Sequence, residues 1–93
     1  MRPSDILDKR DLLLQLAEEA AELSQAAAKF ARELYGNNPT CRTEEELTRA
    51  LEEELADVLV VVAELPFRPD WDVVRAKQKR WIERITARNK SEG

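Results

Sequence analysis

The sequence contains no histidine, one cysteine and only two glycines among its 93 residues. The lack of histidine excludes His-based general acid–base catalysis, Ser-His-Asp or Cys-His nucleophilic sites, and zinc held by histidine. A single cysteine excludes an intramolecular disulfide framework and a cysteine-rich metal site, and it favours a reducing compartment. Any metal site must therefore depend on oxygen ligands.

Long apolar runs are also missing. The longest, from Val58 to Ala63, is far shorter than the roughly 18 residues that a membrane span requires. Residues 1–5 lack the apolar core of a signal peptide. We therefore expect a cytoplasmic protein that has no membrane partner. Because the chain has only 93 residues, we also expect a single domain over residues 1–93.

Charge is abundant but uneven. The formal net charge is −4, yet residues 1–69 carry 8 basic and 15 acidic residues, whereas residues 70–93 carry 7 basic and 4 acidic residues. The net acidity argues against nucleic-acid binding. Because so short a chain buries only a limited core, we expect homo-oligomerisation, as a homodimer or homotetramer.

Apolar periodicity predicts an all-α, three-helix chain that forms a helical bundle. The first helix runs from about Asp5 to Tyr35, where Gly36 is expected in the left-handed conformation that favours glycine. After a loop to about Arg42, Thr43 caps a second helix that ends near Leu65. Asp70 caps a third helix that ends near Arg88, and residues 89–93 form a frayed tail. The expected packing stripes are Leu13, Leu16, Ala20, Leu23, Ala27, Phe30 and Leu34, then Leu47, Leu51, Leu55, Val58, Val62 and Leu65, then Val74, Trp81 and Ile85.

Carboxylates flank the first two stripes at matching positions. On a helical wheel, Glu19 and Glu22 lie about 60° and 120° to one side of Leu16. Glu54 and Asp57 lie at the same two angles from Leu51, so antiparallel packing of the helices would bring all four carboxylates together. Their mutual repulsion would be relieved by a hard divalent cation, Mg²⁺ or Mn²⁺. A plain solvated acidic face is the alternative interpretation.

Cations share one flank of the third helix, at Lys77, Arg80 and Arg84. They predict a phosphate clamp opposite metal ions, or else a basic surface that balances the acidic body. Tyr35 and Trp71 lie near helix ends, where an aromatic side chain is freer to contact a ligand than on a packing stripe.

The segments Glu18-Glu19-Ala20-Ala21-Glu22 and Glu54-Leu55-Ala56-Asp57 resemble the motifs of the MazG-type all-α nucleoside triphosphate pyrophosphohydrolases. The resemblance extends over roughly residues 10–88 and implies that Glu19, Glu22, Glu54 and Asp57 bind Mg²⁺. It also implies hydrolysis of a (d)NTP between the α- and β-phosphates to a (d)NMP and pyrophosphate, which cleans the nucleotide pool. With no histidine in the chain, a carboxylate, Glu22 or Glu18, or the metal itself would take the proton of the attacking water. The resemblance also implies a nucleobase, for which Tyr35 and Trp71, near helix ends, are the candidate stacking partners.

Two alternative functions fit the same pattern. One is a non-catalytic helical module for dimerisation or regulation, because a 3-4 apolar spacing also suits a coiled-coil seam. The other is a degenerate family member that binds nucleotide without turnover, because Trp81 stands where many members have an asparagine.

Overall fold

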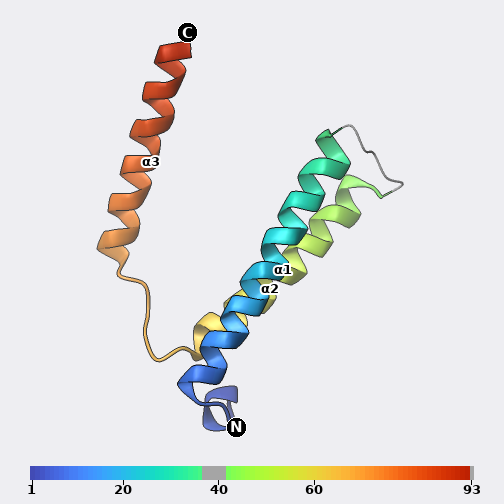
Figure 1. Ribbon diagram of the computed structural model, residues 1–93, viewed down its shortest axis with the longest axis vertical. Coiled ribbons are helices and arrows are strands. Elements are labelled where there is room, and N and C mark those ends of the chain that lie inside the picture. The colour runs from blue at the N-terminus through green and yellow to red at the C-terminus, as the bar shows by residue number, and fades with distance from the viewer. Residues whose placement is uncertain (37–41, 93) are drawn as a thin grey trace.

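Helices make up almost all of the computed structural model, which describes residues 1–36 and 42–92. A short 3₁₀ turn, η1 (Pro3–Asp5), precedes the helices α1 (Lys9–Tyr35), α2 (Glu44–Glu64) and α3 (Trp71–Glu92). α1 and α2 form an antiparallel hairpin, whereas α3 stands apart from it (Figure 1). The all-α class is confirmed, and no strand occurs in the described residues. No described helix is long and apolar enough to cross a membrane.

α1 begins at Lys9 and not near Asp5, because two reciprocal hydrogen bonds close its first turn. The carboxylate of Asp8 accepts the backbone N–H of Asp11 at 2.9 Å, and the carboxylate of Asp11 accepts that of Asp8 at 3.2 Å. Asp5 belongs to η1 instead. The helix start was therefore predicted too early, since the stronger capping signal lies at Asp8.

The starts of the other two helices follow the prediction. The Thr43 hydroxyl accepts the backbone N–H of Glu46 at 3.1 Å. The Asp70 carboxylate accepts the backbone N–H groups of Asp72 and Val73 at 2.9 and 3.4 Å. α3 continues to Glu92, so the expected end near Arg88 was too early.

The end of α1 at Tyr35 was predicted, but its mechanism was wrong. Gly36 has φ −91°, outside the left-handed region. Its N–H donates to the Arg32 carbonyl at 3.0 Å, and a Cβ at this position would lie 2.6 Å from that oxygen. Glycine is needed here for close approach to the backbone. Most of the predicted loop, residues 37–41, lies outside the described residues.

The hairpin buries only part of the predicted stripes. Leu47 and Leu65, both on the predicted second stripe, are buried, with 3% and 6% exposure. The other buried apolar residues of the described chain are Leu12 and Val61, which lie beside the predicted stripes, whereas Leu13 of the first stripe is 41% exposed. Leu12 and Val61 both lie on the carboxylate side of their stripes, so the contact between the helices is shifted toward that side. Ala20 and Ala27, on the other side of the first stripe, offer little apolar area to bury.

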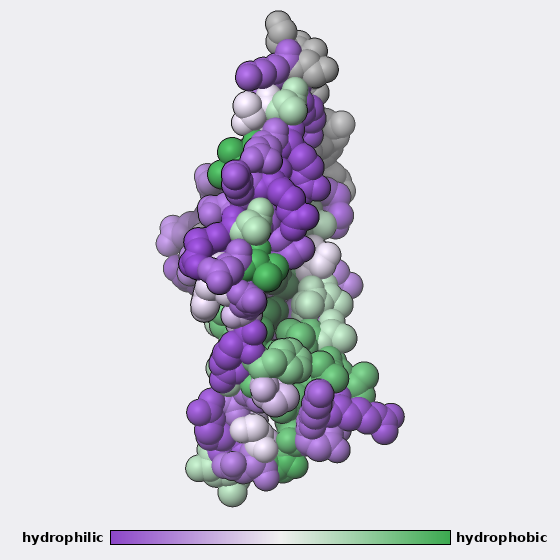
Figure 2. Space-filling model, turned by 90° about the vertical axis from the view of Figure 1, so that its left-hand side faces the viewer, coloured by the Kyte–Doolittle hydropathy of each residue, from purple (hydrophilic) through white to green (hydrophobic). Residues whose placement is uncertain are grey.

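Because the helix contact lies toward the carboxylate side, the other side of the apolar surface is uncovered. Leu55 and Leu59 on α2 are 44% and 65% exposed. The predicted α3 stripe is exposed as well, including Trp81 at 61%, so α3 does not complete a bundle with its own hairpin. Figure 2 shows apolar residues gathered on the lower half of the molecule, where the start of α1 and the end of α2 lie in Figure 1.

An ionic clamp ties the N-terminus to the end of α2. The Arg2 guanidinium donates through Nε to the Glu64 carboxylate at 3.0 Å, and the Ser4 backbone N–H donates to the same carboxylate at 3.0 Å. The hydrogen bond from Arg2, reinforced by that from Ser4, lowers the pKa of Glu64 from 4.5 to about 2. The clamp therefore favours the ionised carboxylate.

The clamp predicts a specific acid sensitivity. Because the pKa of Glu64 is lower in the folded chain, its stabilising effect is present above pH 4.5 and is lost as the pH falls through about 2. Glu64→Gln should therefore unfold more easily than wild type at pH 7, and this difference should shrink steadily as the pH is lowered from 4.5 toward 2. Urea-unfolding midpoints at several pH values measure this, with exposed Glu52→Gln as the control for removing a charge from α2. A gap that stays constant with pH would contradict the prediction.

Candidate metal centre

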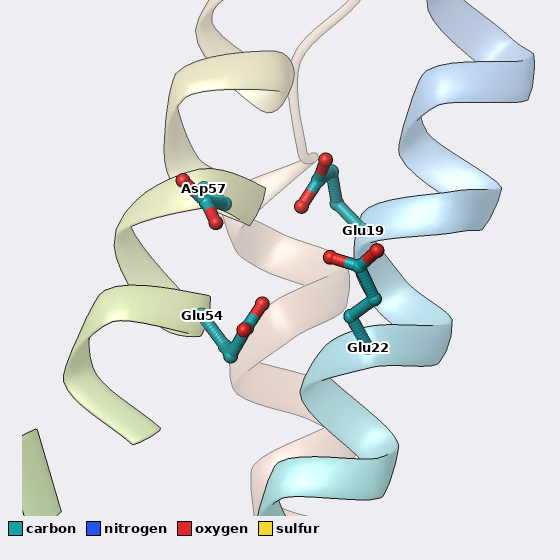
Figure 3. A group of neighbouring side chains, drawn as sticks. All are labelled: Glu19, Glu22, Glu54 and Asp57. Atoms are coloured by element: carbon teal, nitrogen blue, oxygen red, sulfur yellow. The ribbon is translucent and has the colours of Figure 1, made fainter. Parts of the chain in front are cut away.

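Four carboxylates meet between the two helices of the hairpin. α1 supplies Glu19 and Glu22, and α2 supplies Glu54 and Asp57. Each pair is spaced i,i+3, so its members share one face of their helix. One oxygen from each of the four residues lies within 4.8 Å of the others. Figure 3 shows the pairs facing each other across the helix interface, so the predicted convergence is confirmed.

The two less exposed carboxylates of the cluster lack some of the hydrogen bonds that buried oxygens need. Glu19 and Glu54 are half-buried, and Oε2 of each is buried without a hydrogen-bond partner within the described structure. The other oxygen of Glu19 accepts Gln15 Nε2 at 2.8 Å, which orients this side chain. Buried carboxylate oxygens without a partner are costly. Their arrangement therefore fits a ligand that contributes positive charge.

Like charges also perturb the outer carboxylate of α1. The nearby Glu19 raises the pKa of Glu22, and burial and Glu54 act in the same direction. The ionised cluster therefore destabilises the fold as the pH rises, and a cation between the carboxylates would remove this cost. Since all the donors are oxygens, the cluster fits a hard divalent cation.

Comparison with protein families supports this interpretation independently. Residues 8–68 match the family model of the MazG nucleotide pyrophosphohydrolase domain, which is more than half of the chain. The chain belongs to the MazG family. The matched segment covers α1 and α2 with both carboxylate pairs and stops before α3. The family match therefore rests on the sequence of the hairpin, which is called the MazG hairpin below. Comparisons with curated proteins and with solved structures give no match.

Glu18 lies outside the cluster of the MazG hairpin. Its side chain is exposed, and it is not among the four carboxylates that converge. Its negative charge contributes to the raised pKa of Glu22, one helical turn along α1. Of the two predicted proton acceptors, only Glu22 lies in the cluster.

The other predicted site residues lie away from the carboxylates. Lys77, Arg80 and Arg84 line a surface groove whose described lining residues all belong to α3, and α3 stands clear of the MazG hairpin (Figure 1). Tyr35 is 78% exposed and, on a straight helix, about 20 Å along α1 from Glu22. Trp71, at the start of α3, is 64% exposed. A single copy of the chain does not assemble these groups around the cluster.

The sequence interpretation overlooked a cleft that continues from the carboxylates. This cleft of about 590 Å³ lies on the MazG hairpin, and its lining includes Glu22, Glu54, Lys29, Arg32 and Arg42. Lys29 follows Glu22 by seven residues, two helical turns, and so lies near the same face of α1. That spacing was the signal available in the sequence.

Proposed function

We propose that this protein is a Mg²⁺-dependent pyrophosphohydrolase that converts nucleoside triphosphates to monophosphates and pyrophosphate, and so cleans the nucleotide pool. The proposal rests on the four converging carboxylates within a MazG domain. Two of them have a buried oxygen that finds no hydrogen-bond partner in the described part of the chain. Water adds to the α-phosphorus, the bond between the α-phosphorus and the bridging oxygen breaks, and pyrophosphate leaves.

The carboxylates have two roles in this proposal. Glu19, Glu22, Glu54 and Asp57 would hold Mg²⁺, with Mn²⁺ as the alternative ion. When bound, the ion supplies charge stabilisation to the phosphate oxygens and lowers the pKa of water. The chain has no histidine, so a carboxylate is the candidate acceptor for the proton of the attacking water. We assign this to Glu22, which faces the cluster, in preference to the exposed Glu18.

A product assay tests the proposal. The purified protein is incubated with Mg²⁺ and a panel of ribo- and deoxynucleoside triphosphates, and the products are separated by ion-exchange chromatography. We expect monophosphate and pyrophosphate in equal amounts, and no activity after chelation of the metal. Release of orthophosphate together with a nucleoside diphosphate, or no turnover of any nucleotide, would refute the proposal.

Binding of Mg²⁺ alone gives a second test. A cation that binds the folded hairpin stabilises it, so we expect the melting temperature to rise with Mg²⁺ concentration. A non-catalytic helical module would show no such rise. Glu53→Gln, which removes an exposed carboxylate of α2 next to the cluster, should retain the full response.

We further propose that the protein works as a homodimer or homotetramer. A compact monomer of this mass exposes about 5,500 Å², whereas this chain exposes 7784 Å². The radius of gyration is 17.5 Å, against about 12 Å for a compact domain of this length. The excess area is larger than the roughly 800 Å² that each partner buries in a standard interface.

Oligomerisation would also give α3 a role in the reaction. We propose that Lys77, Arg80 and Arg84 contact substrate phosphates when α3 packs against the hairpin of another copy. Tyr35 and Trp71 of the copy that supplies α3 would contact the nucleobase across the same interface. The supporting observations are the exposure of α3 along its length and its position away from its own hairpin.

A further inference from the structure

The cleft beside the carboxylates has two chemically different ends. Glu22 and Glu54 form one end, and Lys29, Arg32 and Arg42 contribute positive charge toward the other. Ala26 and Ala50, both half-buried, line it between these ends. The small alanine side chains leave space from the metal ligands to the cations.

Lys29 is suited to bind an anion in this cleft. In the described part of the chain, it has no ion-pair partner, in contrast to Arg42, which pairs with Glu33. Its Cα lies about 10 Å beyond Glu22 along α1. Helical side chains lean toward the N-terminus of their helix, and from Lys29 this is the direction of the carboxylate cluster.

A structural role explains this lysine less well. Cations stabilise the C-terminal end of a helix dipole, but the effect falls off within the last turn. Arg32 belongs to that turn of α1, whereas Lys29 precedes it. Lys29 also makes no i,i+4 ion pair with Glu33, whose partner is Arg42.

From this arrangement, we propose that the cleft binds the pyrophosphate end of the substrate, with Lys29 as a phosphate-binding residue and Arg32 and Arg42 in support. The inference rests on the proposed function, since it places the β- and γ-phosphates beyond the metal ligands. The lining contains cations and alanines but no described aromatic residue on which a nucleobase could stack. The nucleoside therefore extends away from this cleft.

Calorimetry with the full-length protein and saturating Mg²⁺ tests the inference without requiring turnover. The probes are inorganic pyrophosphate and a nucleoside monophosphate. Lys29→Ala should weaken pyrophosphate binding about tenfold, as expected for one lost hydrogen bond between charged groups, and leave monophosphate binding unchanged. Lys29→Arg should retain most of the pyrophosphate affinity. Arg49→Ala, on an exposed face of α2 outside the cleft, is the matched control and should bind both probes normally.

The outcomes separate this inference from the proposed function. Unchanged pyrophosphate binding in Lys29→Ala, or loss of monophosphate binding in its place, overturns the inference. Wild-type protein that hydrolyses nucleotides but does not bind pyrophosphate also overturns it. Lys29-dependent pyrophosphate binding by a protein that hydrolyses no nucleotide supports the cleft assignment and refutes only the proposed hydrolysis.

Discussion

Glu54→Gln should abolish nucleotide hydrolysis while leaving the hairpin folded. Glu54 is half-buried in the carboxylate cluster, with one oxygen that has no hydrogen-bond partner among the described residues. Metal ions stabilise developing charge by several kcal/mol, and each 1.36 kcal/mol corresponds to a factor of ten. We therefore expect kcat/KM to fall by about a thousandfold or more, measured as pyrophosphate release.

The same substitution should have the opposite effect on stability without metal. Replacing one of four repelling carboxylates by a neutral side chain of similar shape lowers the repulsion that raises the pKa of Glu22. The melting temperature of metal-free Glu54→Gln should equal or exceed that of wild type, and its rise on addition of Mg²⁺ should be lost.

Two comparisons make this result specific. Glu53→Gln removes the adjacent, exposed carboxylate and should retain both activity and the response to Mg²⁺. Glu18→Gln should retain the response to Mg²⁺, because Glu18 lies outside the cluster. Full activity in Glu54→Gln would refute the metal centre, and loss of folding in this variant would show that the carboxylate has a structural role.

The carboxylate cluster was predictable from the sequence because it depends only on helical spacing. Two i,i+3 pairs on the same flank of two antiparallel helices converge when the pairs lie at the same level of the hairpin. Lys29 was harder to find, since a lone exposed lysine on an acidic helix usually serves only as a solvated charge, and Lys29 is exposed. Its meaning depends on the cleft, which is lined from both helices, by Ala26 on α1 and Ala50 on α2 among others.

The helix packing was predicted less well, since the choice between neighbouring residues on a stripe is a tertiary effect. Leu12 and Leu13 are about 100° apart on α1, at opposite edges of one apolar surface. Which of the two is buried depends on the residues of the neighbouring helix, and in this chain it is Leu12. The apolar surface of each helix is wide enough to contact both the other helix of the hairpin and a second partner, such as another copy of the chain. The periodicity of the sequence does not indicate which part of the surface each partner covers. For the same reason, Trp81 was assigned to a core that this chain does not form by itself.

The apolar side of α2 that remains exposed in the single chain predicts a second large effect, on the oligomeric state. Leu59→Lys should dissociate the proposed oligomer without disturbing the hairpin, because Leu59 is already 65% exposed in the single chain. Placing an unpaired charge in a buried interface costs several kcal/mol, and each 1.4 kcal/mol weakens association tenfold. Sedimentation velocity should show an oligomer for wild type and a monomer for Leu59→Lys at the same micromolar concentration.

Val60→Lys is the matched control for this experiment. Val60 is 60% exposed, yet it lies about 100° further round α2 than Leu59, away from the apolar stripe that Leu55 and Leu59 share. This variant should sediment like wild type, whereas a general effect of added charge would dissociate both. If α3 supplies phosphate contacts to another copy, Leu59→Lys should also lose nucleotide hydrolysis and keep the Mg²⁺-dependent rise in melting temperature, since the four carboxylates belong to one chain. A monomeric wild-type protein with full activity would refute the oligomer and leave α3 without a role in the reaction.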